Sequence, residues 1–212
     1  MLTILIGRAK TGKSDTILRR MAELGESSQQ ILLVPEHASH QAEVDVCSAC
    51  GDTASRHAEV LSFRRLSERV LSITGGIADV TLDNGGKLLT LQRALLETAP
   101  QMTVYRKPSQ KVCFLEQMLA LFDELRSYEV TPEILYQQAQ DIDGATHDKL
   151  TDLSLLYAAY EARLRRPGLD ARDRMTKLCD HLEESGYVRD KDIFIDGFTY
   201  FNAQERRALA IF

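Results

Sequence analysis

The sequence lacks any long apolar run. Its first such run, residues 2–6, is far shorter than the core of a signal peptide, and no basic segment precedes it. No later stretch approaches the roughly 18 uninterrupted apolar residues that a membrane span needs. Only four cysteines occur, and without an export signal we interpret them as reduced thiols. We therefore expect a cytoplasmic protein without a membrane association.

The sequence also lacks a strong excess of either charge. Its 26 Lys and Arg against 31 Asp and Glu give a net charge of −5. This balance argues against a protein that binds nucleic acid through bulk charge, but it allows a local basic groove on an acidic body. The 212 residues predict one large domain, or one domain with an insertion, since domains average roughly 150 residues.

Four short apolar runs, rich in branched side chains, predict strands at residues 2–6, 31–34, 59–61 and 193–195. A stretch compatible with a helix follows each of the first three, so we expect a parallel sheet that is buried on both faces. Nothing between about residues 64 and 191 has the pattern of a strand. The fold class is therefore α/β, with a long interruption before the last strand.

The interruption has helical periodicity. Apolar residues repeat at spacings of three and four in two segments, which are Val112, Leu115, Leu119 and Phe122, and Leu150, Leu153, Tyr157, Tyr160 and Leu164. We expect an α/β core of residues 1–77 and 168–212 and an all-helical insertion of residues 78–167. A helix expected over residues 203–212 has no stop signal after it. We therefore expect a core truncated at its C-terminus, in a chain that is part of a longer protein.

A phosphate-loop motif follows the first apolar run. The pattern G-x-x-x-x-G-K-[ST] is matched by Gly7, Arg8, Ala9, Lys10, Thr11, Gly12, Lys13 and Ser14. The glycines let backbone N–H groups curl around phosphate oxygens, and the N-terminus of the following helix adds partial positive charge. Lys13 would contact the β and γ phosphates, and the Ser14 hydroxyl would bind Mg²⁺. ATP and Mg²⁺ are the expected cofactors.

Asp196 directly follows the last predicted strand. A carboxylate at this place in a phosphate-loop protein holds Mg²⁺ through water, while the alternative is a residue that only begins a turn with Gly197. P-loop helicases that hydrolyse ATP normally follow this Asp with a Glu that activates water, and Gly197 stands there instead. The sequence therefore supports nucleotide binding better than hydrolysis, and we assign no catalytic residue.

Three further segments carry a family resemblance together with the phosphate loop: LVPEHASHQAE at residues 33–43, VLSFRRL at 60–66 and IDGFTYF at 195–201. In this order and spacing they resemble the N-terminal part of the AddB (RexB) subunit of the bacterial AddAB helicase-nucleases. Only the phosphate loop is specific by itself. The resemblance spans nearly the whole chain.

The resemblance implies a RecA-like P-loop core similar to domain 1A of superfamily 1 helicases, with an insertion similar to their 1B subdomain. It also implies ATP-dependent processing of double-strand DNA ends before recombination, with an AddA-type helicase-nuclease partner and single-stranded DNA. Phe63 and Arg64 would then contact DNA, because an aromatic ring stacks on a base and an arginine pairs with phosphate. The alternative is a core Phe63 and a solvated Arg64.

The chain also departs from the family. It does not include the family's nuclease domain, its iron–sulfur cysteines or a second RecA-like domain, so we expect no cluster here and neither nuclease nor helicase activity from the isolated chain. Two other functions stay open. One is a small-molecule P-loop kinase that uses the same Lys13 and Ser14, and the other is an interaction scaffold that nucleotide only stabilises.

Cys47 and Cys50 have C-x-x-C spacing, but a closed zinc site needs two more ligands. The nearby imidazoles are those of His37, His40 and His57, and a zinc site would add His37 or His40. Zinc or redox roles remain alternatives to free thiols on a helix, which we favour.

Overall fold

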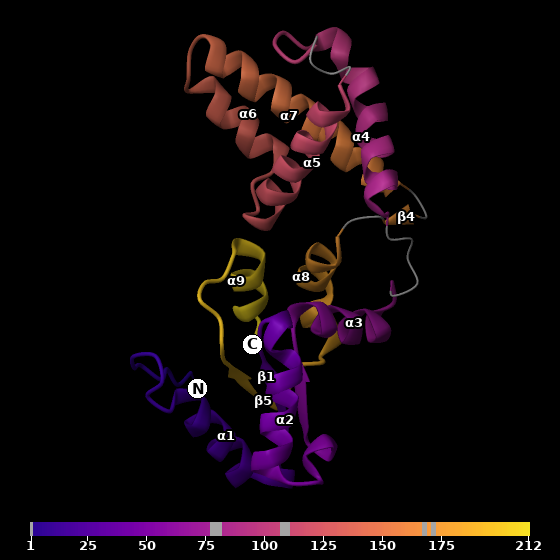
Figure 1. Ribbon diagram of the computed structural model, residues 1–212. Coiled ribbons are helices and arrows are strands. Elements are labelled where there is room, and N and C mark those ends of the chain that lie inside the picture. Colours follow the sequence, from indigo (N-terminus) through magenta and orange to yellow (C-terminus); the bar gives the residue numbers. More distant parts are fainter. Residues whose placement is uncertain (1, 77–81, 107–110, 167–168, 171–172) are drawn as a thin grey trace. The chain divides into compact units, whose positions relative to one another are not determined.

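The computed structural model describes residues 2–76, 82–106, 111–166, 169–170 and 173–212 (Figure 1). The chain forms two compact units. Unit 1 comprises Met1–Ile77, Arg174–Phe201 and Glu205–Phe212, and unit 2 comprises Ala78–Asp173 and Asn202–Gln204. The boundaries expected from the sequence, at 77/78 and 167/168, lie outside the described residues.

Unit 1 alternates helices and strands. Its α-helices and strands are α1 (Lys13–Leu24), β1 (Gln29–Leu33), α2 (Ser39–Cys50), β2 (Ala58–Leu61), α3 (Phe63–Thr74), α8 (Arg174–Ser185), β5 (Lys191–Ile195) and α9 (Ala203–Leu209), of which the first two residues of α9 are grouped with unit 2. Short 3-10 helices, η1 (Gly25–Ser27), η2 (Glu36–Ala38) and η3 (Ala54–Arg56), lie between them.

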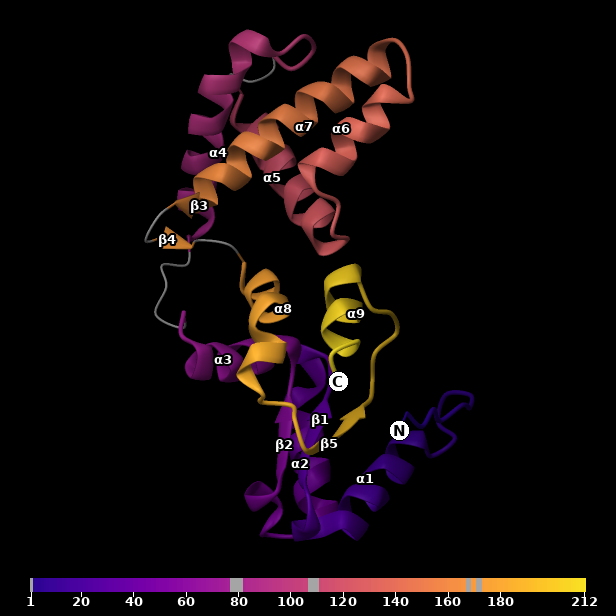
Figure 2. The ribbon, with the colours of Figure 1, turned by 180° about the vertical axis from the view of Figure 1, so that it is seen from behind.

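The three strands form one parallel sheet in the order β2-β1-β5 (Figure 2). Leu32 of β1 lies opposite Val60 of β2 and Phe194 of β5. The expected strands near residues 31–34, 59–61 and 193–195 are therefore confirmed, as is their parallel pairing. Because parallel strands end at the same edge, the segments that follow β1, β2 and β5 meet at the carboxyl edge of this sheet.

Helices cover both faces of the sheet. Alternate side chains of β1 point to opposite faces, as the two-residue period of a strand requires. Ile31 and Leu33 pack with α3, α8 and α9, while Leu32 and the following Val34 pack with Met21 of α1 and with α2. Burial on both faces explains the uninterrupted apolar run at residues 31–34. The outer strand β5 is only partly covered.

The expected strand at residues 2–6 is wrong. This segment has no regular secondary structure, and the side chains of Leu2, Ile4 and Ile6 are 84%, 70% and 93% exposed. In Figure 1 it forms part of the indigo loop before α1. Branched apolar residues favour an extended chain, but a strand also needs a neighbour for its backbone groups. No strand among the described residues pairs with this one.

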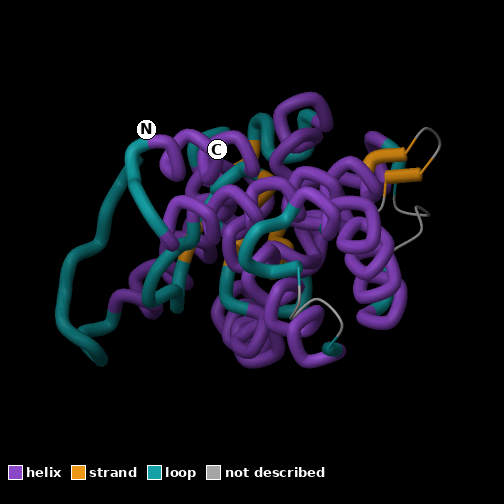
Figure 3. Tube along the Cα trace, turned by 90° about the horizontal axis from the view of Figure 1, so that it is seen from above, coloured by secondary structure: helices purple, strands orange, loops and turns teal. Residues whose placement is uncertain are grey.

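Unit 2 is mainly helical (Figure 3). It contains α4 (Asn84–Thr98), η4 (Ala99–Gln101), α5 (Val112–Ser127), α6 (Pro132–Gln140), α7 (Ala145–Leu164) and the two-residue strands β3 (Arg165–Arg166) and β4 (Leu169–Asp170). β3 and β4 pair antiparallel. The expectation of no strand in this region is therefore wrong in detail, because two-residue strands are too short to leave a periodic pattern in the sequence.

The core of unit 2 forms where the predicted apolar stripes of α5 and α7 meet α4. Phe122 is fully buried, and its ring stacks on Tyr157 with centroids 4.6 Å apart. Tyr160 and Leu164 of α7 and Leu91 of α4 belong to the same cluster. The helical periodicity read from the sequence is therefore confirmed for both helices.

Among the described helices of both units, none is long and apolar enough to cross a membrane.

Candidate functional site

The phosphate-loop motif ends at the N-terminus of α1. Gly12 caps this helix in the left-handed region, with φ 80° and ψ 24°, a conformation that glycine adopts without steric cost. Gly7 faces the same loop, where an added Cβ would lie 2.6 Å from Oγ1 of Thr11. The backbone at position 12 therefore favours glycine, and a side chain at position 7 would have to displace the Thr11 hydroxyl. Ser14 lies exposed in the first turn of α1.

Lys13 folds back over the loop that precedes it. Its Nζ donates to the carbonyl oxygens of Gly7, at 3.0 Å, and of Arg8, at 2.7 Å. Thr11 Oγ1 donates to the same Arg8 carbonyl at 2.8 Å. The ammonium group thus lies inside the loop, on acceptors that an incoming phosphate could replace. A short loop, a lysine and the N–H groups at a helix N-terminus are the donor set that phosphate oxygens require.

Asp196 follows β5 at the carboxyl edge of the sheet. Its backbone N–H donates to the carbonyl of Leu33 at 3.1 Å, which continues the pairing of β5 with β1 by one residue. The next residue, Gly197, has φ 79°, and a Cβ there would lie 3.2 Å from Cδ of Pro35. The Asp196 side chain is half-buried. Within the described chain, no group of three or more His, Cys, Asp or Glu side chains is placed to hold a metal ion.

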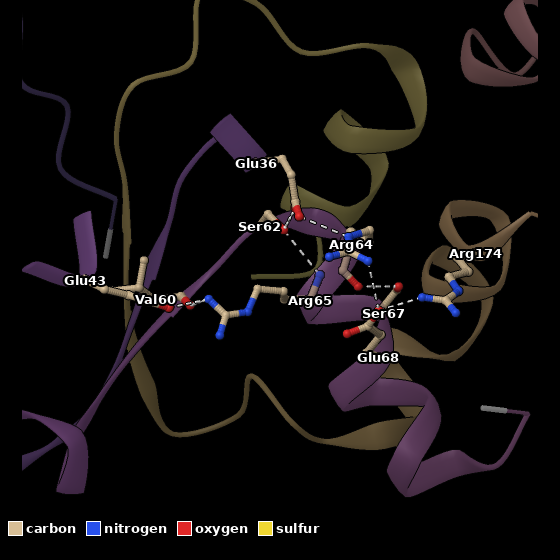
Figure 4. Close-up of polar contacts among 9 residues, drawn as sticks. All are labelled: Glu36, Glu43, Val60, Ser62, Arg64, Arg65, Ser67, Glu68 and Arg174. Atoms are coloured by element: carbon tan, nitrogen blue, oxygen red, sulfur yellow. Dashed lines mark hydrogen bonds and ion pairs between the residues drawn. The ribbon is translucent and has the colours of Figure 1, made fainter. Parts of the chain in front are cut away.

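A polar cluster lies at the same edge, where β1 and β2 end (Figure 4). The Glu36 carboxylate accepts hydrogen bonds from the Ser62 hydroxyl and, at 3.0 Å, from Nε of Arg64. The hydrogen bond from Ser62 is the main cause, with Arg64 alongside, of a lowered pKa for Glu36. Ser62 also caps α3, because its Oγ accepts from the backbone N–H of Arg65 at 3.3 Å.

The two residues expected to contact DNA differ in exposure. Phe63 is only 8% exposed, and its ring makes an edge contact with Phe198, with centroids 5.7 Å apart. It is a core side chain in this conformation, and stacking on a base would require the start of α3 to open. The Arg64 side chain is 61% exposed and lies at the surface.

Sequence reasoning did not find the partners of Arg64. Besides Glu36, the guanidinium lies 3.6 Å from the carboxylate of Glu68, one turn further along α3. Arg174, at the start of α8, donates to that same carboxylate at 2.6 Å. The four-residue spacing of Arg64 and Glu68 on a helix is a signal that charge patterning could have used. Glu36 and Arg174 come from distant segments and left no such signal.

The cysteine pair lies on α2. Cys47 is exposed and Cys50 half-buried, and both are free thiols. Burial, followed by the neighbouring Cys47, raises the pKa of Cys50, so it is a poor thiolate and a poor metal ligand. Cys47 lines a shallow surface hollow together with His40 and Glu43, but in the part of the chain that the structure describes no such residues are grouped to bind a metal ion.

Unit 1 defines a class of protein: an α/β protein with a parallel sheet and a phosphate-loop motif at the start of its first helix. The chain belongs to the AddB N-terminal family, because the model of that family, described as "ADDB, N-terminal", matches residues 4–211.

The curated relatives carry one common name. Each is named as the B subunit of an ATP-dependent helicase/deoxyribonuclease. The relative in Desulforamulus reducens is 37% identical over 213 residues, and the one in Clostridium kluyveri is 31% identical over 209 residues. The relative in Clostridioides difficile is 31% identical over 211 residues. Each alignment covers 96% of this chain and 18% of the relative, so the chain spans about a fifth of the length of these relatives.

Proposed function

We propose that this chain is the N-terminal, ATP-binding, helicase-like domain of an AddB-type subunit that processes double-strand DNA ends for recombinational repair in the cytoplasm. Its partner would be an AddA-type helicase-nuclease subunit. The observation that carries the proposal is the phosphate-loop motif at the N-terminus of α1 in a chain that matches the AddB family from residue 4 to 211. The finer assignment, a RecA-like core of the 1A type with a 1B-like helical insertion, is supported by the parallel sheet of unit 1 and the helices of unit 2.

ATP would bind through this chain's own donors. Lys13 would exchange the carbonyls of Gly7 and Arg8 for phosphate oxygens, and the first N–H groups of α1 would face the same anion. The Ser14 hydroxyl and the Asp196 carboxylate are oxygen ligands of the kind that Mg²⁺ prefers. Bound Mg²⁺ would neutralise phosphate charge. Because Gly197 stands where a Glu would activate water, we expect the isolated chain to bind ATP without robust turnover.

The phosphate loop is tested by thermal melting with and without ATP and Mg²⁺. Ligand at one hundred times its Kd stabilises a folded protein by about 2.7 kcal/mol, so the melting temperature of unit 1 should rise by several degrees. Lys13→Ala should abolish the shift. Arg19→Ala, which removes an equal charge from an exposed position of α1 outside the loop, is the control and should keep the shift. An equal shift in Lys13→Ala and the parent chain would refute the assignment.

DNA binding is tested with single-stranded oligonucleotides. Arg64 is an exposed cation at the carboxyl edge of a parallel sheet, where ligands of α/β proteins bind. We expect weak binding that falls steeply between about 50 and 200 mM salt, and weaker binding by Arg64→Ala. No binding at about 50 mM salt would instead favour a scaffold that nucleotide stabilises.

A further inference from the structure

Glu36 lies against Arg64 and Ser62 at the carboxyl edge of the sheet. One carboxylate oxygen accepts from the hydroxyl of Ser62 and the other from Nε of Arg64 (Figure 4). Ser62 is only 2% exposed, and its cap on α3 fixes the position of the hydroxyl. A hydroxyl and a guanidinium held side by side are donors that suit a carboxylate and a phosphate oxygen equally.

Two carboxylates of the chain itself balance the positive charge of Arg64. Its guanidinium lies between the carboxylates of Glu36, at 3.0 Å, and of Glu68, at 3.6 Å. The carboxylate of Glu68 is shared with Arg174 at 2.6 Å. Within the described residues Glu36 forms its ion pair with Arg64 alone, so it is the anion that depends on this guanidinium. A nucleic-acid phosphate that approaches Arg64 therefore meets a negative charge already in place.

The pair can open at low cost. The side chain of Glu36 is 52% exposed, and that of Arg64 is 61% exposed. Ion pairs this open to water contribute little to stability, since solvent and salt screen them. Glu36 can therefore turn into solvent without leaving an uncompensated buried charge.

We propose that Glu36 is an internal competitor for phosphate at Arg64, and that it holds the affinity of this edge for single-stranded nucleic acid low. The inference rests on the proposed DNA-binding function. On binding, a backbone phosphate displaces the carboxylate and accepts from Arg64 and Ser62 in its place. Glu36 is a specificity-determining residue in this scheme, because any anion must outcompete it at Arg64.

The test replaces the charge and keeps the shape. Glu36→Gln keeps the size of the side chain, and its one carbonyl oxygen can still accept from Ser62 or from Arg64. The competing charge and one of the two accepted hydrogen bonds are therefore lost. Glu43→Gln is the matched control: it removes one negative charge from a neighbouring exposed pair, Glu43 with Arg65. The probe is a fluorescent oligothymidylate, and anisotropy titrations are run at about 50 and 200 mM salt.

Glu36→Gln should bind the probe about two- to fivefold more tightly than the parent chain at low salt, which is the range that an exposed ion pair supports. The slope of its log affinity against log salt concentration should be steeper, by up to the amount that one additional phosphate contact gives. Glu43→Gln should change the affinity less than Glu36→Gln does. The double variant Glu36→Gln with Arg64→Ala should bind no more tightly than Arg64→Ala alone. Thermal melts check that each variant is folded.

Four results overturn the inference. Equal gains in Glu36→Gln and Glu43→Gln would mean that only bulk charge matters. Weaker binding by Glu36→Gln would mean that Glu36 orients Arg64 for DNA rather than opposing it. Binding that Arg64→Ala weakens but Glu36→Gln leaves unchanged would overturn the competition alone, whereas no binding by the parent chain or by Glu36→Gln would overturn the proposed DNA-binding function as well.

Discussion

Replacing Asp152 should destabilise unit 2 strongly. This carboxylate lies in the middle of α7 and is only 2% exposed. It accepts hydrogen bonds from three successive backbone N–H groups, those of Thr103 at 3.0 Å, Val104 at 2.7 Å and Tyr105 at 2.9 Å. Asp152 therefore holds the segment that connects α4 and α5 against helix α7. Thr103 and Asp152 are 49 positions apart in the sequence.

The magnitude follows from the three bonds. A hydrogen bond to a charged acceptor contributes about 1.5–3 kcal/mol, and a buried donor left without a partner costs about 1–3 kcal/mol. The connection can move and hydrate some of these N–H groups, so the full sum will not be lost. We expect Asp152→Asn to lower the free energy of unfolding of unit 2 by about 3–5 kcal/mol, a large part of the roughly 5–15 kcal/mol typical of a domain.

The assay must report on unit 2 alone. Hydrogen exchange of the amides of α4, α5 and α7, read by mass spectrometry, gives the local free energy of opening. Urea denaturation followed by circular dichroism gives the global value. Asp143→Asn is the control, because Asp143 is an exposed residue in the α6–α7 connection and its change removes the same charge. A loss below about 1 kcal/mol for Asp152→Asn, or one equal to the control, would refute the reasoning.

Two further predictions concern unit 2. Arg126→Met should lower the free energy of unfolding of unit 2 by about 3–5 kcal/mol, because the buried guanidinium donates to Glu161 at 2.8 Å and the carboxylate would lose this partner. Urea denaturation of Arg126→Met, compared with Arg126→Lys, measures the loss. An unchanged denaturation midpoint for Arg126→Met would contradict the prediction. Burial raises the pKa of Tyr157 and of Tyr160 from 10.0 to about 12. Since the pKa values in the folded state exceed those in the unfolded state, the two protonated tyrosines contribute stability that is present below about pH 10 and is lost as pH rises toward 12. The melting temperature should therefore fall across that range, and the double Tyr→Phe variant should lack this part of the fall.

Local pattern predicted most of the secondary structure. The branched runs of β1, β2 and β5 and the apolar stripes of α5 and α7 depend on neighbours in sequence, so their types could be read directly. The phosphate-loop motif was equally visible, because its glycines and lysine lie within one short segment. The run at residues 2–6 has the same composition as the strands but no pairing partner among the described strands, and composition alone could not reveal this.

Tertiary structure decided which polar groups meet. Arg174 reaches Glu68 across 106 positions, Asp152 reaches Thr103 across 49, and Glu36 reaches Ser62 across 26. Such pairs arise because the sheet brings the ends of distant strands to one edge and because helices pack by their apolar faces. The sequence by itself thus determined the family, the phosphate-loop motif and the order of most elements. The burial of Phe63, and the carboxylates that hold Arg64, followed only from packing, since charge partners far apart in sequence leave no periodic trace.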